Sequence, residues 1–207
     1  MFENYPLFIA ACVLLVITPG PNLLYLISRT LCQGRAAGLL SLAGTTSGFV
    51  VHILAASLGL SAVLIAVPVL FDVVRYAGAA YLLWLAWDSV RARGAALFTP
   101  RPLPAEPAGK LFRTGMLTSI LNPKVALFYL ALFPQFIAPA HGSVLLQSLL
   151  LGATQIVIAV IGDALFVLAA ARVSGWLAAR PAWTAVQRYV QGGVFAAIAV
   201  RLAVTDR

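Results

Sequence analysis

The chain has 207 residues, of which 62% are hydrophobic and only 10% are charged, and its formal net charge is +8. A soluble domain usually carries roughly a quarter charged residues, so this composition excludes an ordinary soluble protein and indicates an integral membrane protein. The basic residues stand in short clusters between apolar runs, which is typical of membrane topology signals rather than of nucleic-acid binding. We therefore expect a lipid bilayer around the chain and no nucleic-acid partner.

The apolar runs predict six membrane-spanning helices, because a helix needs about 20 apolar residues to cross the hydrocarbon core. The predicted spans cover residues 6–27, 38–63, 68–88, 113–137, 144–171 and 183–204. The N-terminus has no basic stretch before the first run, so we expect a membrane helix there rather than a cleaved signal peptide. The fold class is all-α.

The first predicted span is interrupted by Thr18-Pro19-Gly20-Pro21-Asn22. Proline lacks the N–H that continues a helix, and glycine adds backbone freedom, so these residues predict a helix break. The N–H and C=O groups that a break releases cannot face lipid. We expect the break at Thr18–Asn22 to lie against protein or a wet cavity.

Lysine and arginine are distributed unequally between the two sides of the predicted bundle. The first, third and fifth loops carry ten of them, and the opposite side carries three: Arg29, Arg35, Arg91, Arg93, Arg101, Lys110, Arg113, Arg172, Arg180 and Arg188 against Arg75, Arg201 and Arg207. Because cytoplasmic loops carry the excess of basic residues, this bias places both termini in the periplasm.

The longest loop contains four prolines and indicates a semi-rigid linker within a single transmembrane domain. It divides the chain into a first repeat at about residues 1–90, a linker at about 91–112, and a second repeat at about 113–207. Each repeat holds three predicted spans, so the two would enter the membrane in opposite directions. We therefore predict two inverted three-helix repeats.

The second repeat contains a similar interruption at Asn122-Pro123-Lys124, in the middle of its first span. Paired breaks at corresponding positions are typical of a transporter binding site, whereas two unrelated proline kinks are the structural alternative. The pairing of an asparagine with a proline in each break favours the binding site.

Glycines four residues apart, Gly34 with Gly38 and Gly44 with Gly48, predict close helix packing. Contact within the bundle is the simpler interpretation, and a homodimer stays open.

Charged residues inside spans are costly and need a reason. Asp163 in the fifth span is either a carboxylate that binds and releases a proton during transport or the partner of Lys124 in an ion pair. His52 in the second span is either a hydrogen-bonded buried histidine or part of a proton relay. Gln155, two turns before Asp163, could face the same cavity.

No motif of an enzyme stands out: G-x-S-x-G and H-E-x-x-H are both missing, and the two histidines lie far apart in the sequence. We expect no catalytic residues, no metal site and no cofactor. A channel would require a ring of like charges or a filter motif, and neither is visible.

Several motifs together resemble the LysE/RhtB family of amino-acid exporters over residues 4–204. They are Thr18-Pro19-Gly20-Pro21-Asn22, Gly34-Arg35-Ala36-Ala37-Gly38, Gly48-x-x-x-His52, Ala77-Gly78-Ala79-Ala80-Tyr81-Leu82, Asn122-Pro123-Lys124 and Leu132-Phe133-Pro134-Gln135-Phe136. The resemblance implies a transporter of the bacterial inner membrane that exports amino acids or close derivatives by proton antiport. It also implies an acid in the fifth span near Ala159, one helical turn before Asp163.

By this likeness, Asn22 and Asn122 form the substrate site with their prolines, Pro21 and Pro123, and Lys124 lies beside it. We also assign Gly20 of the first break to the substrate site, and Asp163 and His52, as residues within spans, are the candidates for proton coupling. We expect the N–H groups of the first break to bind the substrate carboxylate. Carbonyl groups freed by the prolines and the asparagine amides would bind the ammonium group. Alternating access would follow from rocking of the two repeats. The competing interpretation is a membrane scaffold or assembly protein that transports nothing.

Overall fold

A computed structural model describes residues 5–18, 20–66 and 104–178, together with isolated residues between 76 and 87 and between 189 and 200. Apart from these isolated residues, the predicted spans at 68–88 and 183–204 and the 77–82 motif lie outside the described residues, as do Pro19 and most of the linker. The count of six spans and the inverted repeat therefore stay predictions.

Both predicted helix breaks are confirmed. Helix α1 (Tyr5–Ile17) and helix α2 (Pro21–Gln33) meet at a bend of 48°. Helix α5 (Ala108–Ile120) and helix α6 (Pro123–Leu127) meet at a bend of 46°. Beyond α6 the chain tightens into a π-helical turn, η1 (Phe128–Leu132), and a 3₁₀ turn, η2 (Phe133–Phe136). In both cases the second half-helix begins at a proline, which suits the first helical position because its missing N–H would have no partner there.

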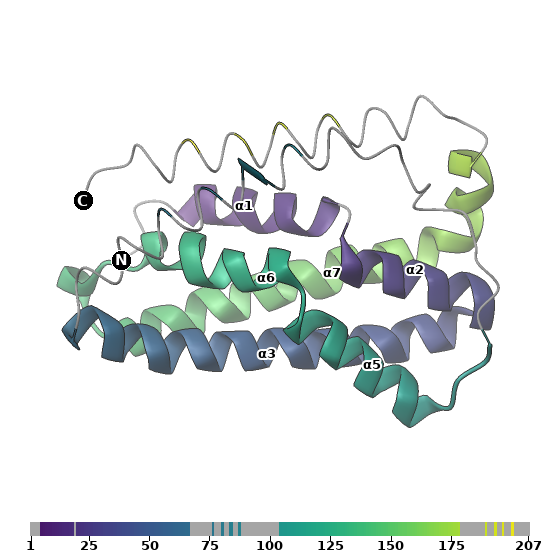
Figure 1. The fold of residues 1–207 in the computed structure, drawn as a ribbon, viewed down its shortest axis with the longest axis horizontal. Helices are drawn as coiled ribbons and strands as arrows, with labels where there is room; N and C mark the ends of the chain where they lie inside the picture. Colours follow the sequence, from purple (N-terminus) through teal and green to yellow (C-terminus); the bar gives the residue numbers. More distant parts are fainter. Residues whose placement is uncertain are drawn as a thin grey trace.

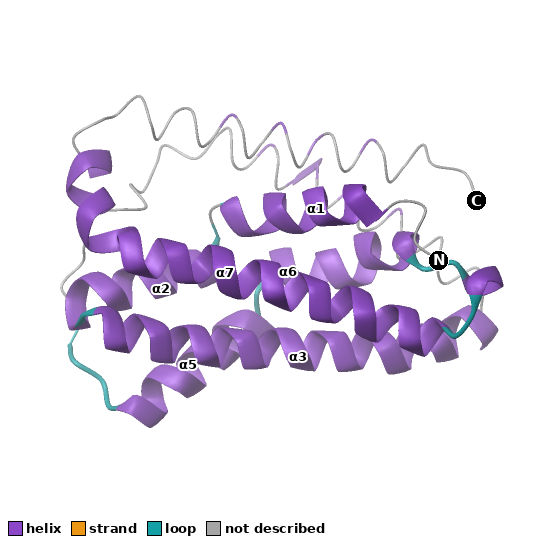
Figure 2. Ribbon diagram, turned by 180° about the vertical axis from the view of Figure 1, so that it is seen from behind, coloured by secondary structure: helices purple, strands orange, loops and turns teal. Residues whose placement is uncertain are grey.

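Two unbroken helices form the long elements of the bundle. Helix α3 (Arg35–Ala66) and helix α7 (Val144–Ala178) run in opposite directions along each other (Figures 1 and 2). Both contain a stretch that is long and apolar enough to cross a membrane, and each bent pair would add one more span, which gives up to four within the described residues. The gap between the predicted spans 113–137 and 144–171 contains the short 3₁₀ turn η3 (Pro139–His141).

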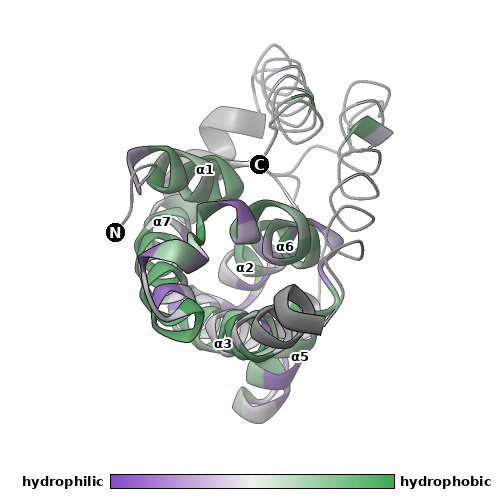
Figure 3. Ribbon diagram, turned by 90° about the vertical axis from the view of Figure 1, so that its left-hand side faces the viewer, coloured by the Kyte–Doolittle hydropathy of each residue, from purple (hydrophilic) through white to green (hydrophobic). Residues whose placement is uncertain are grey.

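Helix α1 illustrates how the bundle divides its apolar residues. Phe8, Cys12 and Val16 recur every four residues and are buried against α3, α7 and the residues after the second break. The opposite face of α1 is also apolar but exposed, and it includes Val13 and Ile17. A helix that is hydrophobic all round suits a lipid environment outside and a packed core inside. Figure 3 shows the helices end-on around a common centre, with hydrophobic residues prevailing.

The glycines of α3 pack within the bundle, as predicted. A Cβ atom on Gly44 would collide with the backbone of α5 at Phe112, and one on Gly48 would collide with Ser119. The missing side chains let α3 and α5 approach closely, which is the usual role of small residues four apart in membrane helices. These contacts leave the question of a homodimer untouched.

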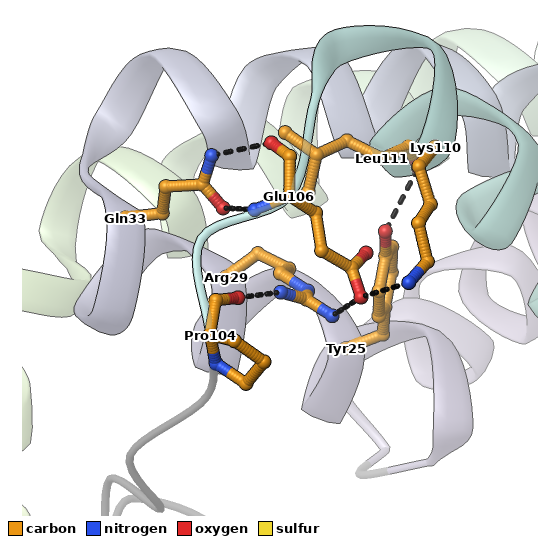
Figure 4. Close-up of polar contacts among 7 residues, drawn as sticks. All are labelled: Tyr25, Arg29, Gln33, Pro104, Glu106, Lys110 and Leu111. Atoms are coloured by element: carbon orange, nitrogen blue, oxygen red, sulfur yellow. Dashed lines mark hydrogen bonds and ion pairs between the residues drawn. The ribbon is translucent and has the colours of Figure 1, made fainter.

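The structure corrects the placement of Arg29, which the sequence assigns to a cytoplasmic loop. It lies inside α2 and its side chain is only 7% exposed, because the end of the linker folds back to neutralise it (Figure 4). Its guanidinium donates to the Pro104 carbonyl at 3.1 Å and pairs with the Glu106 carboxylate at 2.9 Å. The amide of Gln33 exchanges hydrogen bonds with both the N–H and the carbonyl of Glu106. The linker therefore ends in a clamp, made of residues 104–110, on α2.

Glu106 is the charged centre of this clamp, since Lys110 also pairs with it at 3.1 Å. Burial acts to raise the pKa of its carboxyl, but the hydrogen bond from Lys110 and the positive charge of Arg29 outweigh this and hold the pKa below its usual value of 4.5. A carboxyl whose pKa is lowered by folding stabilises the folded state above its ordinary pKa and loses that contribution as the pH falls below it.

We expect Glu106→Gln to lower the melting temperature of the detergent-solubilised protein at pH 7 by roughly 5 °C, because the substitution leaves Arg29 buried without a counter-charge. The difference from the wild type should begin to shrink below pH 4.5 and should disappear once the pH falls through the lowered pKa, where the folded wild-type carboxyl becomes protonated. The matched control is Lys110→Gln, since the Lys110 side chain is 60% exposed and its pairing should contribute little. Equal melting temperatures for Glu106→Gln and the wild type at pH 7 would contradict the clamp.

Candidate functional site

The two helix breaks meet at a pair of asparagines that lie 100 residues apart in the chain. The Nδ2 atom of Asn122 donates to the Oδ1 atom of Asn22 at 3.0 Å, and Asn22 in turn donates to the hydroxyl of Ser119 at 3.3 Å. The remaining oxygen, Oδ1 of Asn122, caps α6 by accepting from the N–H of Lys124 at 3.0 Å. Both asparagines are buried, so the breaks form one continuous polar centre.

The first break frees the carbonyl group of Leu15, because the residue four positions later is Pro19, which has no N–H. Lys124 from the second break satisfies this carbonyl. Its Nζ atom donates to Leu15 at 2.8 Å and to the carbonyl of Thr18 at 2.6 Å. A positive charge suits this place, since the C-terminal end of a helix carries a partial negative charge. The amine also lies against Gly20, where an added Cβ atom would come within 3.1 Å of Nζ.

The second break frees the carbonyl group of Ser119, because Pro123 follows four positions later. His52 from α3 helps to satisfy it: the Nε2 atom of His52 lies 3.2 Å from this oxygen and donates its N–H to it. The N–H of Asn122 donates to the same oxygen at 3.2 Å. Each freed carbonyl is thus bound by a basic side chain from the other part of the chain.

A small cavity lies beside the two asparagines, at the N-terminal end of α2. Its volume is about 20 Å³, which is room for about one water molecule. Its walls combine five apolar and five polar side chains: Leu15, Val16, Leu23, Phe49, Val125, Asn22, Asn122, Lys124, Gln155 and Asp163. No side chain caps the N-terminus of α2, so the N–H groups of its first turn have no side-chain acceptor. In this conformation the cavity is too small for an amino acid.

Asp163 contributes a carboxyl group to this cavity and is only 4% exposed. Among the described residues, no hydrogen bond or ion pair to its carboxylate is present. In particular, Asp163 and Lys124 share the cavity without coming within 4 Å as an ion pair, so the predicted pairing of these two residues is not what this conformation contains. The lysine bonds to backbone carbonyls instead, and the acid faces the cavity alone.

His52 lies one layer away from the cavity. Its ring stacks on the ring of Tyr129 from η1, with the centroids 5.6 Å apart and an interplanar angle of 2°. The hydroxyl of Tyr129 donates at 2.6 Å to Oε1 of Gln155, which does line the cavity. The contacts of His52 match the alternative of a hydrogen-bonded buried histidine, and a role in proton transfer stays a prediction.

The structure therefore brings together most of the residues that the sequence singled out. Gly20, Pro21, Asn22, Asn122, Pro123 and Lys124 surround the meeting point of the breaks. Sequence reasoning missed Ser119 and Tyr129 and gave little weight to Gln155. Ser119 could have been found, because its carbonyl stands four residues before a proline. No pattern in the sequence marks Tyr129 among its apolar neighbours.

Comparisons with known proteins found a matching family and similar sequences. A model of the family described as LysE type translocator matches residues 13–206. A homoserine/homoserine lactone efflux protein of Salmonella typhi is 31% identical over 176 residues, which cover 85% of this chain and 84% of that protein. A leucine efflux protein of Enterobacter sp. (strain 638) is 29% identical over 204 residues, which cover 97% of this chain and 95% of that protein. No solved structure matches the chain.

We expect Lys124→Met to destabilise the protein, because the Leu15 and Thr18 carbonyls lose their donor and an unmet buried polar group costs about 1–3 kcal/mol. The melting temperature in detergent should fall by several degrees. The matched control is Lys110→Met, the same change at a lysine whose side chain is 60% exposed. If Lys124→Met has the same melting temperature as the wild type, Lys124 does not hold the first break in place.

Proposed function

The chain belongs to the LysE type translocator family, and from this premise we propose that it is a secondary transporter that exports amino acids or their close derivatives. The names of its relatives, homoserine/homoserine lactone efflux protein and leucine efflux protein, support this substrate class. The proposed location is the bacterial inner membrane, with both termini in the periplasm, as the distribution of basic residues indicates.

The substrate binds where the two helix breaks meet. The observation that carries this proposal is the cavity beside Asn22 and Asn122, whose walls present a cation, an anion and the uncapped N-terminus of α2. A zwitterionic amino acid needs partners of both signs, and unpaired backbone N–H groups suit its carboxylate. Because the cavity holds only about one water molecule now, the substrate enters a wider conformation. Rocking of two inverted repeats against each other would open the cavity to this wider conformation.

Lys124 and Asp163 couple the substrate to the proton. In this conformation the lysine occupies the carbonyls of Leu15 and Thr18, which are the groups that would accept hydrogen bonds from a substrate ammonium. When Asp163 loses its proton, its negative charge attracts Lys124 and these carbonyls become free. When Asp163 gains a proton, the lysine returns to the carbonyls and displaces the substrate. Proton uptake then accompanies substrate release, which is proton antiport.

We expect Asn22→Ala and Asn122→Ala to abolish export while the protein still inserts into the membrane, because each substitution removes one half of the polar centre. Efflux from cells loaded with amino-acid-containing dipeptides measures export, and immunoblotting of membranes measures insertion. Ser47→Ala is the control, since this hydroxyl bonds only to the backbone of its own helix at Ala43. Wild-type efflux from either asparagine variant would overturn the site. If the protein were instead a membrane scaffold, the wild-type protein itself would transport no substrate in proteoliposomes.

Asp163→Asn should abolish export driven by the proton gradient, because the amide cannot gain or lose a proton. Any remaining flux should no longer respond to a protonophore. Asp163→Glu keeps a titratable carboxyl and should restore part of the coupling. Protonophore-sensitive export at the wild-type rate in Asp163→Asn would show that another group carries the proton.

A further inference from the structure

One hydrogen-bond donor at the cavity has no partner. The side chain of Gln155, on α7, is 0% exposed, and its Oε1 atom accepts from the hydroxyl of Tyr129 at 2.6 Å. The other end of the amide, Nε2, is buried and bonds to nothing within the described part of the protein. Four other buried side-chain atoms there lack a partner in the same way, on Arg29, Ser41, Glu106 and Ser148, but none of these residues lines the cavity.

The orientation of the Gln155 amide is fixed by Tyr129 and the rings packed around it. The ring of Tyr129 is stacked on His52 and packs against Phe128 and Phe133, with ring centroids 5.4 Å and 5.1 Å away. The tyrosine hydroxyl therefore has a defined position, and it holds the oxygen of Gln155 on its own side. The NH₂ group is left to face the cavity, where a buried donor without an acceptor is unfavourable. Such a group is positioned for an oxygen that arrives with a ligand.

The other residues of the cavity indicate which oxygen of a ligand would accept a hydrogen bond from Gln155. Lys124, Asp163 and the N-terminus of α2 provide charge and partial charge for the carboxylate and the ammonium group of an amino acid. The amide of Gln155, two turns before Asp163 on α7, is a neutral donor and is matched to a neutral acceptor. Phe49 and Val125 supply apolar contact around it.

We propose that Gln155 is a specificity-determining residue that donates a hydrogen bond to an oxygen in the substrate side chain. The preferred substrates are then amino acids with a side-chain hydroxyl oxygen, rather than aliphatic amino acids. This inference rests on the proposed function, since it assigns a substrate to the same cavity. A site with a buried donor disfavours a ligand that leaves the donor unpaired.

The test compares export of homoserine with export of leucine. In proteoliposomes, the wild type should prefer homoserine by roughly tenfold, the usual effect of one neutral hydrogen bond. Gln155→Met has nearly the same shape but no donor, so the preference should disappear through a loss of homoserine transport while leucine transport is retained. Tyr129→Phe keeps the stacked ring and removes the hydroxyl that orients the amide, so it should shift the ratio in the same direction. The control Ser148→Ala changes another buried, unpartnered side chain of α7 outside the cavity and should leave the ratio unchanged.

The outcomes separate this inference from the proposed function. Equal losses of homoserine and leucine transport in Gln155→Met, or a wild type without a preference for homoserine, would overturn the role of Gln155 while export itself stands. A wild type that transports neither compound, nor any other amino acid, would overturn the proposed function. If Gln155→Met does not insert, an unchanged ratio in Tyr129→Phe would overturn the inference.

Discussion

The structure depends on one constraint: a carbonyl group that a proline deprives of its N–H partner cannot face lipid and must find another donor. Pro19 releases Leu15 and Pro123 releases Ser119. The replacement donors come from elsewhere in the chain, as Lys124 binds the first carbonyl and His52 contributes to the second. Each break is therefore completed by the other half of the described bundle, and the two halves are held in register by polar bonds at the place where each is weakest as a helix.

The same constraint explains why the polar side chains gather in one place. A membrane bundle tolerates charges and amides only where backbone groups or other side chains can satisfy them. The breaks offer such partners, and Asn22, Asn122 and Lys124 use them. Within the described part of the chain, two groups at the cavity lack such partners, namely the carboxyl group of Asp163 and the Nε2 atom of Gln155. Groups that are costly to bury and left unsatisfied at a cavity are the strongest sign that the arrangement serves something other than stability.

Much of this organisation could be predicted from the sequence, because proline, glycine and long apolar runs act locally. The breaks at Thr18–Asn22 and Asn122–Pro123 and the helices on either side follow from such signals. The hydrogen-bond partners of the polar side chains do not follow from such signals. Whether Lys124 reaches Asp163 or a carbonyl depends on the distance between helices that contact each other only in the folded bundle. Arg29 was misplaced for a related reason, since its burial depends on Glu106 from the linker, and the sequence indicates only that this linker is semi-rigid. The position of Tyr129 depends on the His52 ring that stacks on it, and the pattern of apolar residues in the sequence does not predict this contact.

The bond between Lys124 and Leu15 joins residues 109 positions apart. The ribosome adds about 5–20 residues per second, so the first broken helix exists for some 5–20 s before its lysine is made. Throughout that interval the open carbonyls at the end of α1 have no donor from their own chain. Until the second broken helix is made, these carbonyl groups need hydrogen bonds from water or from the insertion machinery. The first broken helix can pack fully in lipid only after that. The order of synthesis thus means that the first break is completed only after the fourth predicted span has been made.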